Sequence, residues 1–307
     1  MTHIRNQHES YDIVIDDYVA LGKRRVISSF WTKTDLKREI VTTLIVFLLF
    51  ATVSLVMVWE MTYASYYSPT DSILKDALYD IIPQLKYYYL PDIPLLTSFG
   101  VVLVWLISTR PNLMIYTIRN ILLFCVPMFV LRGLFLFVTV LPDPNGLCFA
   151  ANPQLVAFKQ LPFKIAYPEI MKHYLRMEYS MCADLIFSGH TLFSLYMTVL
   201  VYHLKTTETN PKIPKWVDTT VLSLTYVLWA LTIVFIIATR FHYTIDVLIA
   251  IVMVFYNSIA MQSFIKWCVR TRKFPTFVKL YYGAFEPHLD ESTFLLPAPR
   301  FYRSQQK

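Results

Sequence analysis

Six long apolar runs follow one another along the 307 residues of the chain, and each is a candidate to cross a lipid bilayer. A transmembrane helix needs about 20 mostly apolar residues, because each residue adds about 1.5 Å of length. The predicted spans are residues 39–59, 95–109, 113–141, 185–204, 217–239 and 244–267. We therefore expect an all-α, polytopic membrane protein with six transmembrane helices.

The composition agrees with a membrane domain. Hydrophobic residues make up 56% of the chain and charged residues 16%, whereas soluble domains average about 45–50% apolar and about 25% charged residues. The charged residues cluster between the apolar runs. We expect one membrane domain at residues 39–267, with an N-terminal tail at 1–38 and a C-terminal tail at 268–307.

The net charge of +7 does not indicate a nucleic-acid partner. No soluble segment carries a basic patch with interleaved aromatic residues. The positive charges flank the apolar runs instead, where they orient helices and contact anionic lipids. We therefore expect a protein whose partners are membrane lipids.

Lysine and arginine predict the orientation of the spans. Six of these residues precede the first span: Lys23, Arg24, Arg25, Lys33, Lys37 and Arg38. Basic residues near a span favour the cytosolic side. Six crossings would place segments 110–112, 205–215 and 266–307 on that same side, and all three carry lysine or arginine close to the membrane. The sequence thus predicts cytosolic N- and C-termini.

The first outer loop holds apolar residues at helical spacing between Ile73 and Ile82, and Thr70 with Asp71 could cap this short helix. It would lie in the membrane interface or form a packed lid without a role in binding. Further along, residues 87–89 are tyrosines. They could make cation–π contacts with choline or belong to an interfacial aromatic belt.

The second outer loop, residues 142–183, holds Cys148 and Cys182. Both would face an oxidising compartment, so a disulfide and two free thiols remain alternatives. Glu169 and Glu178 could supply another acid to a site on this side, and nothing in the sequence selects either. Cys125 is expected to behave as an ordinary apolar residue.

Two histidines begin two different spans. His190 follows Ser188 and Gly189 at the start of the fourth span, and His242 stands at the start of the sixth. Both spans run from the outside to the cytosol, so topology puts both imidazoles at one membrane surface. Asp246 follows His242 by four residues and shares its helix face. A carboxylate behind a histidine fixes its tautomer and stabilises its charged form.

These residue types suit the transfer of a phosphoryl-linked group, which needs a nucleophile, a proton donor and hydrogen-bond donors for phosphate. His242, oriented by Asp246, could attack phosphorus, and His190 could protonate the leaving oxygen. The amides opened by Ser188 and Gly189 could bind the phosphate. A single interfacial histidine more often only snorkels or caps a helix, but the shared surface and the paired aspartate favour catalysis.

Three more charged residues have candidate roles. Arg132 lies inside the third span, about 13 Å from its outer end, where an arginine is costly and functional by default. It could reach a lipid phosphate or pair with an intramembrane acid. Asp184 could orient His190 or cap the fourth span. Arg119 lies near the cytosolic end, where snorkelling explains it. We expect no metal and no cofactor, because the histidines are occupied and the acids do not cluster.

The residues around both histidines resemble a known superfamily. Ser188-Gly189-His190, followed later by His242 and Asp246, resembles the type-2 phosphatidic acid phosphatase superfamily. The longer stretches 182–191 and 242–247 are more similar to the sphingomyelin synthase family. Further similarity lies in Arg119, Arg132, the run 137–142 and, more weakly, Leu90-Pro91-Asp92. The resemblance covers roughly residues 91–246.

The resemblance implies six spans and a sphingolipid synthase. Such an enzyme transfers a phospho-headgroup from a glycerophospholipid to ceramide and releases diacylglycerol. It would make His190, His242 and Asp246 the catalytic triad, at the Golgi-lumenal or extracellular face. Choline leads slightly as the headgroup, with ethanolamine and inositol as alternatives. The choice between Golgi and plasma membrane and the oligomeric state, including a homo-oligomer, stay open.

The chain departs more from the motifs of the lipid phosphatases than from those of the synthase family. Ala183 stands where the synthase family usually has glycine. Lipid phosphatases carry a lysine–arginine–proline motif, and Arg110-Pro111 lacks that lysine. They also carry an arginine six residues before the second histidine, where this chain has Ile236, and the nearest arginine is Arg240. Both absences favour a transferase over a lipid phosphate phosphatase. A lipid transporter without activity is the remaining alternative.

Overall fold

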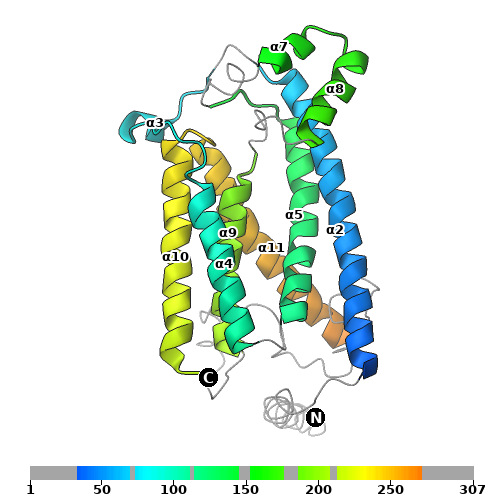
Figure 1. The fold of residues 1–307 in the computed structure, drawn as a ribbon, viewed down its shortest axis with the longest axis vertical. Helices are drawn as coiled ribbons and strands as arrows, with labels where there is room; N and C mark the ends of the chain where they lie inside the picture. Colours follow the sequence, from blue (N-terminus) through cyan, green and yellow to red (C-terminus); the bar gives the residue numbers. More distant parts are fainter. Residues whose placement is uncertain are drawn as a thin grey trace, which may run out of the picture.

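The computed structural model describes residues 33–69, 73–110, 114–144, 153–175, 186–207 and 213–271. Within these residues the chain is all-helical, as predicted, and six long helices form an elongated bundle (Figure 1). The long helices are α2 (Lys33–Tyr67), α4 (Asp92–Thr109), α5 (Met114–Val138), α9 (Gly189–Thr207), α10 (Lys215–Ala238) and α11 (Thr244–Thr271). Three short helices gather at one end: α3 (Ala77–Ile81), α7 (Pro153–Lys159) and α8 (Phe163–Leu175).

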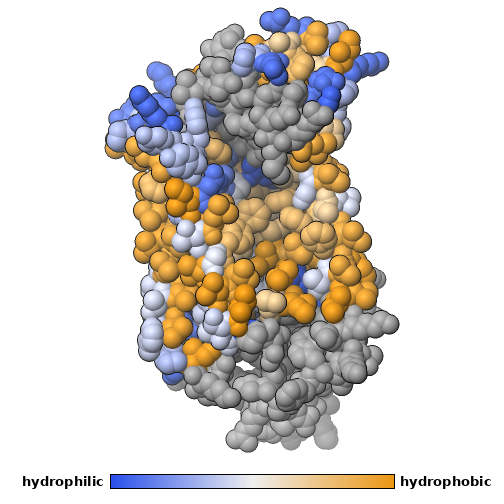
Figure 2. Space-filling model, viewed as in Figure 1, coloured by the Kyte–Doolittle hydropathy of each residue, from blue (hydrophilic) through white to orange (hydrophobic). Residues whose placement is uncertain are grey.

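Five of the described helices are long and apolar enough to cross a membrane: α2, α4, α5, α10 and α11. Their exposed faces carry large apolar side chains, which cover the sides of the molecule in Figure 2. Such extensive exposed apolar surface is typical of contact with lipid rather than water. The chain is therefore described as an integral membrane protein.

Helix α9 differs from these five because it lies inside the bundle. It contacts α4, α10 and α11, and polar residues such as Ser194, Thr198 and His203 are buried on it. A helix surrounded by protein needs less hydropathy than one that faces lipid. Consecutive long helices alternate in direction, with α9 running as α4 and α11 do (Figure 1). Six spans and cytosolic termini remain predictions.

The first predicted span was wrong at its outer end. It was expected to stop at Trp59, but α2 continues past Glu60 to Tyr67. The Glu60 carboxylate lies against Gly133 of α5, where a Cβ atom would overlap it. The glycine therefore leaves room for this side chain between two packed helices, α2 and α5.

The short helix of the first outer loop also differs from its prediction. It begins at Ala77, and Asp76 caps it by accepting a hydrogen bond from Leu78 N at 3.0 Å. Residues 73–76 are not helical, and the predicted caps Thr70 and Asp71 lie outside the described residues. Asp76 has the extended backbone angles of an N-cap residue, which stands just before the first helical turn, so the apolar residues before it lie outside the helix.

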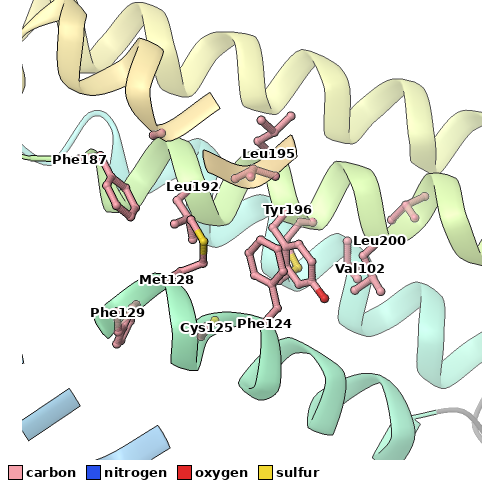
Figure 3. Packing of buried hydrophobic residues seen from close by; sticks show 14 of the residues in the cluster. Val102, Phe124, Cys125, Met128, Phe129, Phe187, Leu192, Leu195, Tyr196 and Leu200 are labelled. Atoms are coloured by element: carbon pink, nitrogen blue, oxygen red, sulfur yellow. The ribbon is translucent and has the colours of Figure 1, made fainter. Parts of the chain in front are cut away.

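A buried apolar core connects the two sides of the bundle (Figure 3). Phe124 of α5 stacks on Tyr196 of α9 with ring centroids 3.7 Å apart. Met128 and Leu192 continue this contact toward the end where α9 begins. Cys125 lies in the same core as a buried free thiol. The core thus joins the α2–α5 pair to the group formed by α4, α9, α10 and α11.

Candidate functional site

The fourth long helix begins later than predicted, at Gly189 rather than Leu185, because Ser188 caps it. The Ser188 Oγ accepts hydrogen bonds from Thr191 N at 3.3 Å and Thr191 Oγ1 at 3.1 Å. His190 therefore stands in the first turn of α9. The N–H groups of a first helical turn have no acceptor within the helix, so those of Gly189 and His190 are suited to bind an anion.

His190 contacts a carboxylate that was not among the predicted site residues. Its Nε2 lies 2.7 Å from Oδ1 of Asp92, the first residue of α4. Asp184, the predicted candidate for this role, lies outside the described residues. Two sequence features could have indicated Asp92. It belongs to the Leu90-Pro91-Asp92 similarity, and the predicted topology puts the start of the second span at the same end as the start of the fourth. We name this end of the bundle the histidine end.

His242 lies in the turn between α10 and α11 and is buried, as is Asp246 in the first turn of α11. Asp246 Oδ2 accepts a hydrogen bond from Tyr243 N at 3.0 Å. It lies 3.8 Å from His242 Nδ1, a distance that suits an ion pair and is too long for a hydrogen bond. Within the described residues Asp246 Oδ1 has no hydrogen-bond partner. The carboxylate therefore keeps capacity to stabilise a charged His242.

Burial lowers the pKa of His242 below its ordinary value. The Asp246 carboxylate acts in the opposite direction, and the charges of Arg132 and His190 add to the lowering. Burial disfavours the charged form of an imidazole, and so do nearby positive charges. His242 is therefore neutral at neutral pH, the form in which a ring nitrogen can act as a nucleophile.

The two histidines lie close together at the histidine end. Their ring centroids are 6.4 Å apart, and the ring of Phe241 lies 5.1 Å from that of His190 and 5.3 Å from that of His242. Ser188 N donates a hydrogen bond to Asp246 O at 3.3 Å, which ties the start of α9 to α11. Reacting atoms in productive complexes lie about 3–3.5 Å apart, so a phosphoryl group fits between the two imidazoles.

Arg132 reaches this place from the other side of the bundle. It is a buried residue of α5, and its Nη1 donates a hydrogen bond to Phe187 O. A Cβ atom on Gly189 would lie 2.7 Å from the same nitrogen, so the guanidinium needs a glycine there. In Figure 2 the visible face is hollowed between the α4–α10 side and the α2–α5 side. Arg132 thus links two groups of helices at the start of α9.

Two other arginines lie away from the histidines. Arg110 follows α4 at the end opposite to Asp92, about 27 Å away by helix length. It forms a salt bridge to Asp218 at 2.8 Å, and Trp105 Nε1 donates to the same carboxylate at 2.9 Å. Arg119 is fully buried, so the prediction that it snorkels is wrong. It lies on the face of α5 that also buries Leu123.

The remaining candidates contribute little to this site. Glu169 pairs with Lys172 at 3.7 Å on an exposed part of α8. Glu178, Cys148 and Cys182 lie outside the described residues. No group of three or more His, Cys, Asp or Glu side chains in the described part of the chain is placed to bind a metal ion.

Residues 181–263 match the family described as "PAP2 superfamily C-terminal". This range contains His190, His242 and Asp246. The match supports the type-2 phosphatidic acid phosphatase superfamily. No curated protein matches the chain. Members of the superfamily are lipid phosphatases and phosphotransferases, so the match fits an enzyme of lipid metabolism. It does not distinguish the sphingomyelin synthase family within the superfamily.

Proposed function

We propose that the chain is a sphingolipid synthase. It transfers a phospho-headgroup, phosphocholine first among the candidates, from a glycerophospholipid to the primary hydroxyl of ceramide. The observation that carries this proposal is the pair of imidazoles 6.4 Å apart at the histidine end, each beside a carboxylate. The residues around both histidines, which are most similar to the sphingomyelin synthase family, support ceramide as the acceptor.

The first half of the reaction forms a phosphohistidine. Neutral His242 attacks the phosphorus of the donor lipid through Nε2, because Nδ1 faces Asp246. The bond between phosphorus and the diacylglycerol oxygen breaks, and that oxygen takes a proton from His190. Asp246 stabilises the positive charge that develops on His242. Contacts of this kind are often long in a free enzyme and shorten in the transition state, which suits the 3.8 Å separation.

The second half returns the enzyme to its starting state. His190, now neutral, accepts the proton of the ceramide primary hydroxyl while the hydroxyl oxygen attacks phosphorus. The bond between phosphorus and His242 Nε2 breaks, and the new phospholipid leaves. Asp92, 2.7 Å from His190 Nε2, stabilises the protonated imidazole and holds its orientation.

Arg132 and the start of α9 bind the phosphoryl oxygens in this mechanism. The guanidinium of Arg132 already donates to Phe187 O and occupies the space that a Cβ atom on Gly189 would need. An arginine and the exposed amides of a first helical turn are both strong partners for phosphate. Of the four predicted substrate-binding residues, Arg132 and Gly189 contact the phosphoryl group directly. Ser188 caps α9 and so holds its first turn in place. Asp184, the fourth, lies outside the described residues and stays a predicted substrate-binding residue.

The histidine end would face the Golgi lumen or the cell exterior, with both termini in the cytosol and α9 as the fourth of six spans. Ceramide and the donor lipid would enter from the bilayer, and diacylglycerol would return to it. Phosphocholine is the first candidate for the transferred headgroup, and phosphoethanolamine and phosphoinositol are the alternatives.

Hydrolysis is the competing reaction, since the superfamily also contains phosphatases. The described arginines argue against it. Arg110 is engaged with Asp218 at the opposite end of the bundle, and Ile236, where phosphatases carry a phosphate-binding arginine, is fully buried. The phosphate contacts typical of the phosphatases are therefore replaced by Arg132 in our proposal.

The decisive experiment is product analysis with purified enzyme. Fluorescent ceramide is supplied with phosphatidylcholine, phosphatidylethanolamine or phosphatidylinositol in turn. We expect a fluorescent sphingophospholipid together with diacylglycerol, fastest with phosphatidylcholine. The variant His242→Asn should abolish transfer. Release of free phosphate or phosphocholine without a ceramide product would identify a hydrolase, and an active His242→Asn enzyme would exclude the phosphohistidine.

A further inference from the structure

Arg240 lies two residues before His242 and has no role in the reaction proposed above. Its φ of 57° is unusual for a residue with a Cβ atom. The guanidinium carbon lies 4.0 Å from the centre of the Tyr79 ring, and Nη2 donates a hydrogen bond to Tyr79 O at 2.6 Å. Arg240 is therefore committed to Tyr79, on the short helix α3.

Tyr79 in turn contacts His242 directly. Its hydroxyl donates a hydrogen bond to His242 O at 2.9 Å, and its ring stacks on Tyr243 with centroids 6.0 Å apart. Burial raises the pKa of Tyr79, with the nearby Asp76 carboxylate adding to this effect. The hydroxyl therefore stays protonated at neutral pH and can donate this hydrogen bond.

The α3 segment is fixed independently to the start of α11. One Asp76 carboxylate oxygen accepts a hydrogen bond from Thr244 N at 2.6 Å, and the other accepts from Thr244 Oγ1 at 2.7 Å. In the same segment, Leu74 N donates to the Tyr243 hydroxyl at 3.2 Å. Tyr79 therefore presents its hydroxyl from an anchored element and not from a free loop.

The backbone of His242 needs such support because it stands before the helix. The first described bonds of the α11 turn go to Tyr243 O, from Asp246 N at 3.0 Å and Val247 N at 3.4 Å. The direction of an imidazole follows from the backbone that carries it. A small rotation at residue 242 would move the nucleophilic nitrogen relative to His190.

We propose that Tyr79, held in place by Arg240, is a positioning residue that fixes His242 for attack on phosphorus. This inference rests on the proposed role of His242. It gives the first outer loop a function in the reaction, beyond covering the end of the bundle.

The variant Tyr79→Phe tests the hydrogen bond alone, since the ring can still stack on Arg240 and Tyr243. We expect kcat to fall about fivefold to tenfold, as for the loss of one aligned hydrogen bond, with lipid KM values unchanged. The matched control is Tyr66→Phe. The Tyr66 hydroxyl also donates to a backbone carbonyl, Leu161 O at 2.8 Å, but this bond lies between α2 and the segment that joins α7 to α8. The Tyr66→Phe variant should lose a similar amount of thermal stability and keep wild-type kcat.

The variant Arg240→Gly tests the contact between Arg240 and Tyr79. Glycine adopts a φ of 57° without strain, so the variant removes the guanidinium and its alkyl chain without straining the backbone. We expect the kcat of Tyr79→Phe, and no further fall in the double variant, because both changes break one connected path. Wild-type kcat in Tyr79→Phe, an equal fall in Tyr66→Phe, or multiplied losses in the double variant would each overturn the inference.

These kcat ratios are measured on whichever reaction the wild-type enzyme performs. An enzyme that hydrolyses its donor would overturn the proposed ceramide transfer and still show the same ratios if Tyr79 positions His242. A fully active His242→Asn enzyme would overturn both proposals together.

Discussion

The contact between Gly189 and Arg132 predicts that Gly189→Ala loses far more activity than stability. In Gly189→Ala the new Cβ would lie 2.7 Å from Arg132 Nη1, about 0.7 Å closer than an ordinary contact of about 3.4 Å between carbon and nitrogen. The guanidinium is the end of a flexible side chain, so it moves and the helix start does not. It then leaves Phe187 O, to which it donates in the native protein.

The displaced guanidinium also leaves the proposed phosphate position. A hydrogen bond to a charged group contributes about 1.5–3 kcal/mol, which corresponds to a fall of roughly 10- to 100-fold in kcat/KM for headgroup transfer. Replacing glycine by alanine reduces the entropy that the chain loses on folding, a gain of about 0.4–1 kcal/mol. This gain offsets part of the cost of the lost hydrogen bond to Phe187 O, so the thermal midpoint should fall only slightly.

Gly100→Ala is the matched control, because nothing lies within 4 Å of a Cβ atom at that position. It should keep wild-type activity. Both variants are assayed with fluorescent ceramide in lipid vesicles of the same composition. If Gly189→Ala has wild-type kcat/KM while Gly100→Ala behaves as expected, Arg132 does not bind the transferred phosphate and our reading of this contact is wrong.

Three further outcomes follow from the other charged groups. Asp92→Asn should lower kcat about tenfold, a modest effect because the Asp92 side chain is 51% exposed and its charge is screened; an unchanged kcat would show that His190 needs no carboxylate. Because burial lowers the pKa of His242, kcat/KM should fall on the acid side only below about pH 6.5, as His242 becomes protonated. Asp246→Asn removes the contribution that raises this pKa, so a pH–rate profile should show the acid limb at lower pH, and a shift to higher pH would contradict the assignment. Arg110→Met, which breaks the salt bridge to Asp218 far from the histidines, should lower the thermal midpoint by several degrees and leave kcat unchanged; a fall in kcat would link the two ends of the bundle.

Several parts of the site could be predicted because they depend on order along the chain. Apolar runs of sufficient length predict helices, and alternating crossings bring the starts of the fourth and sixth spans to one end. The helical repeat was expected to place Asp246 on the same side as His242; His242 lies in the turn before α11 instead, and its Nδ1 is still 3.8 Å from the Asp246 carboxylate. These arguments need no knowledge of which helices are neighbours. The structure has both histidines at one end with their centroids 6.4 Å apart.

Other parts depend on contacts between residues far apart in the chain. Asp92 was noted only as part of the Leu90-Pro91-Asp92 similarity, and its contact with His190 requires α4 to lie beside α9. Helix α2 continues to Tyr67, past the predicted end of the span at Trp59, and so carries the charged Glu60. Its accommodation depends on a glycine in the neighbouring helix α5. Asp76 caps α3 and at the same time binds Thr244, a pairing that local periodicity cannot indicate.

The sequence by itself determined that this chain is a helical membrane protein with two histidines and an aspartate at one end. Hydropathy, charge and helical period are properties of neighbouring residues, so they can be read before any folding is known. Only the tertiary structure decided that Asp92 holds His190, that Arg132 reaches Gly189 and that Tyr79 reaches His242. Each of these is a contact between separate helices or loops, and such contacts depend on how side chains of different size fill the space between packed elements.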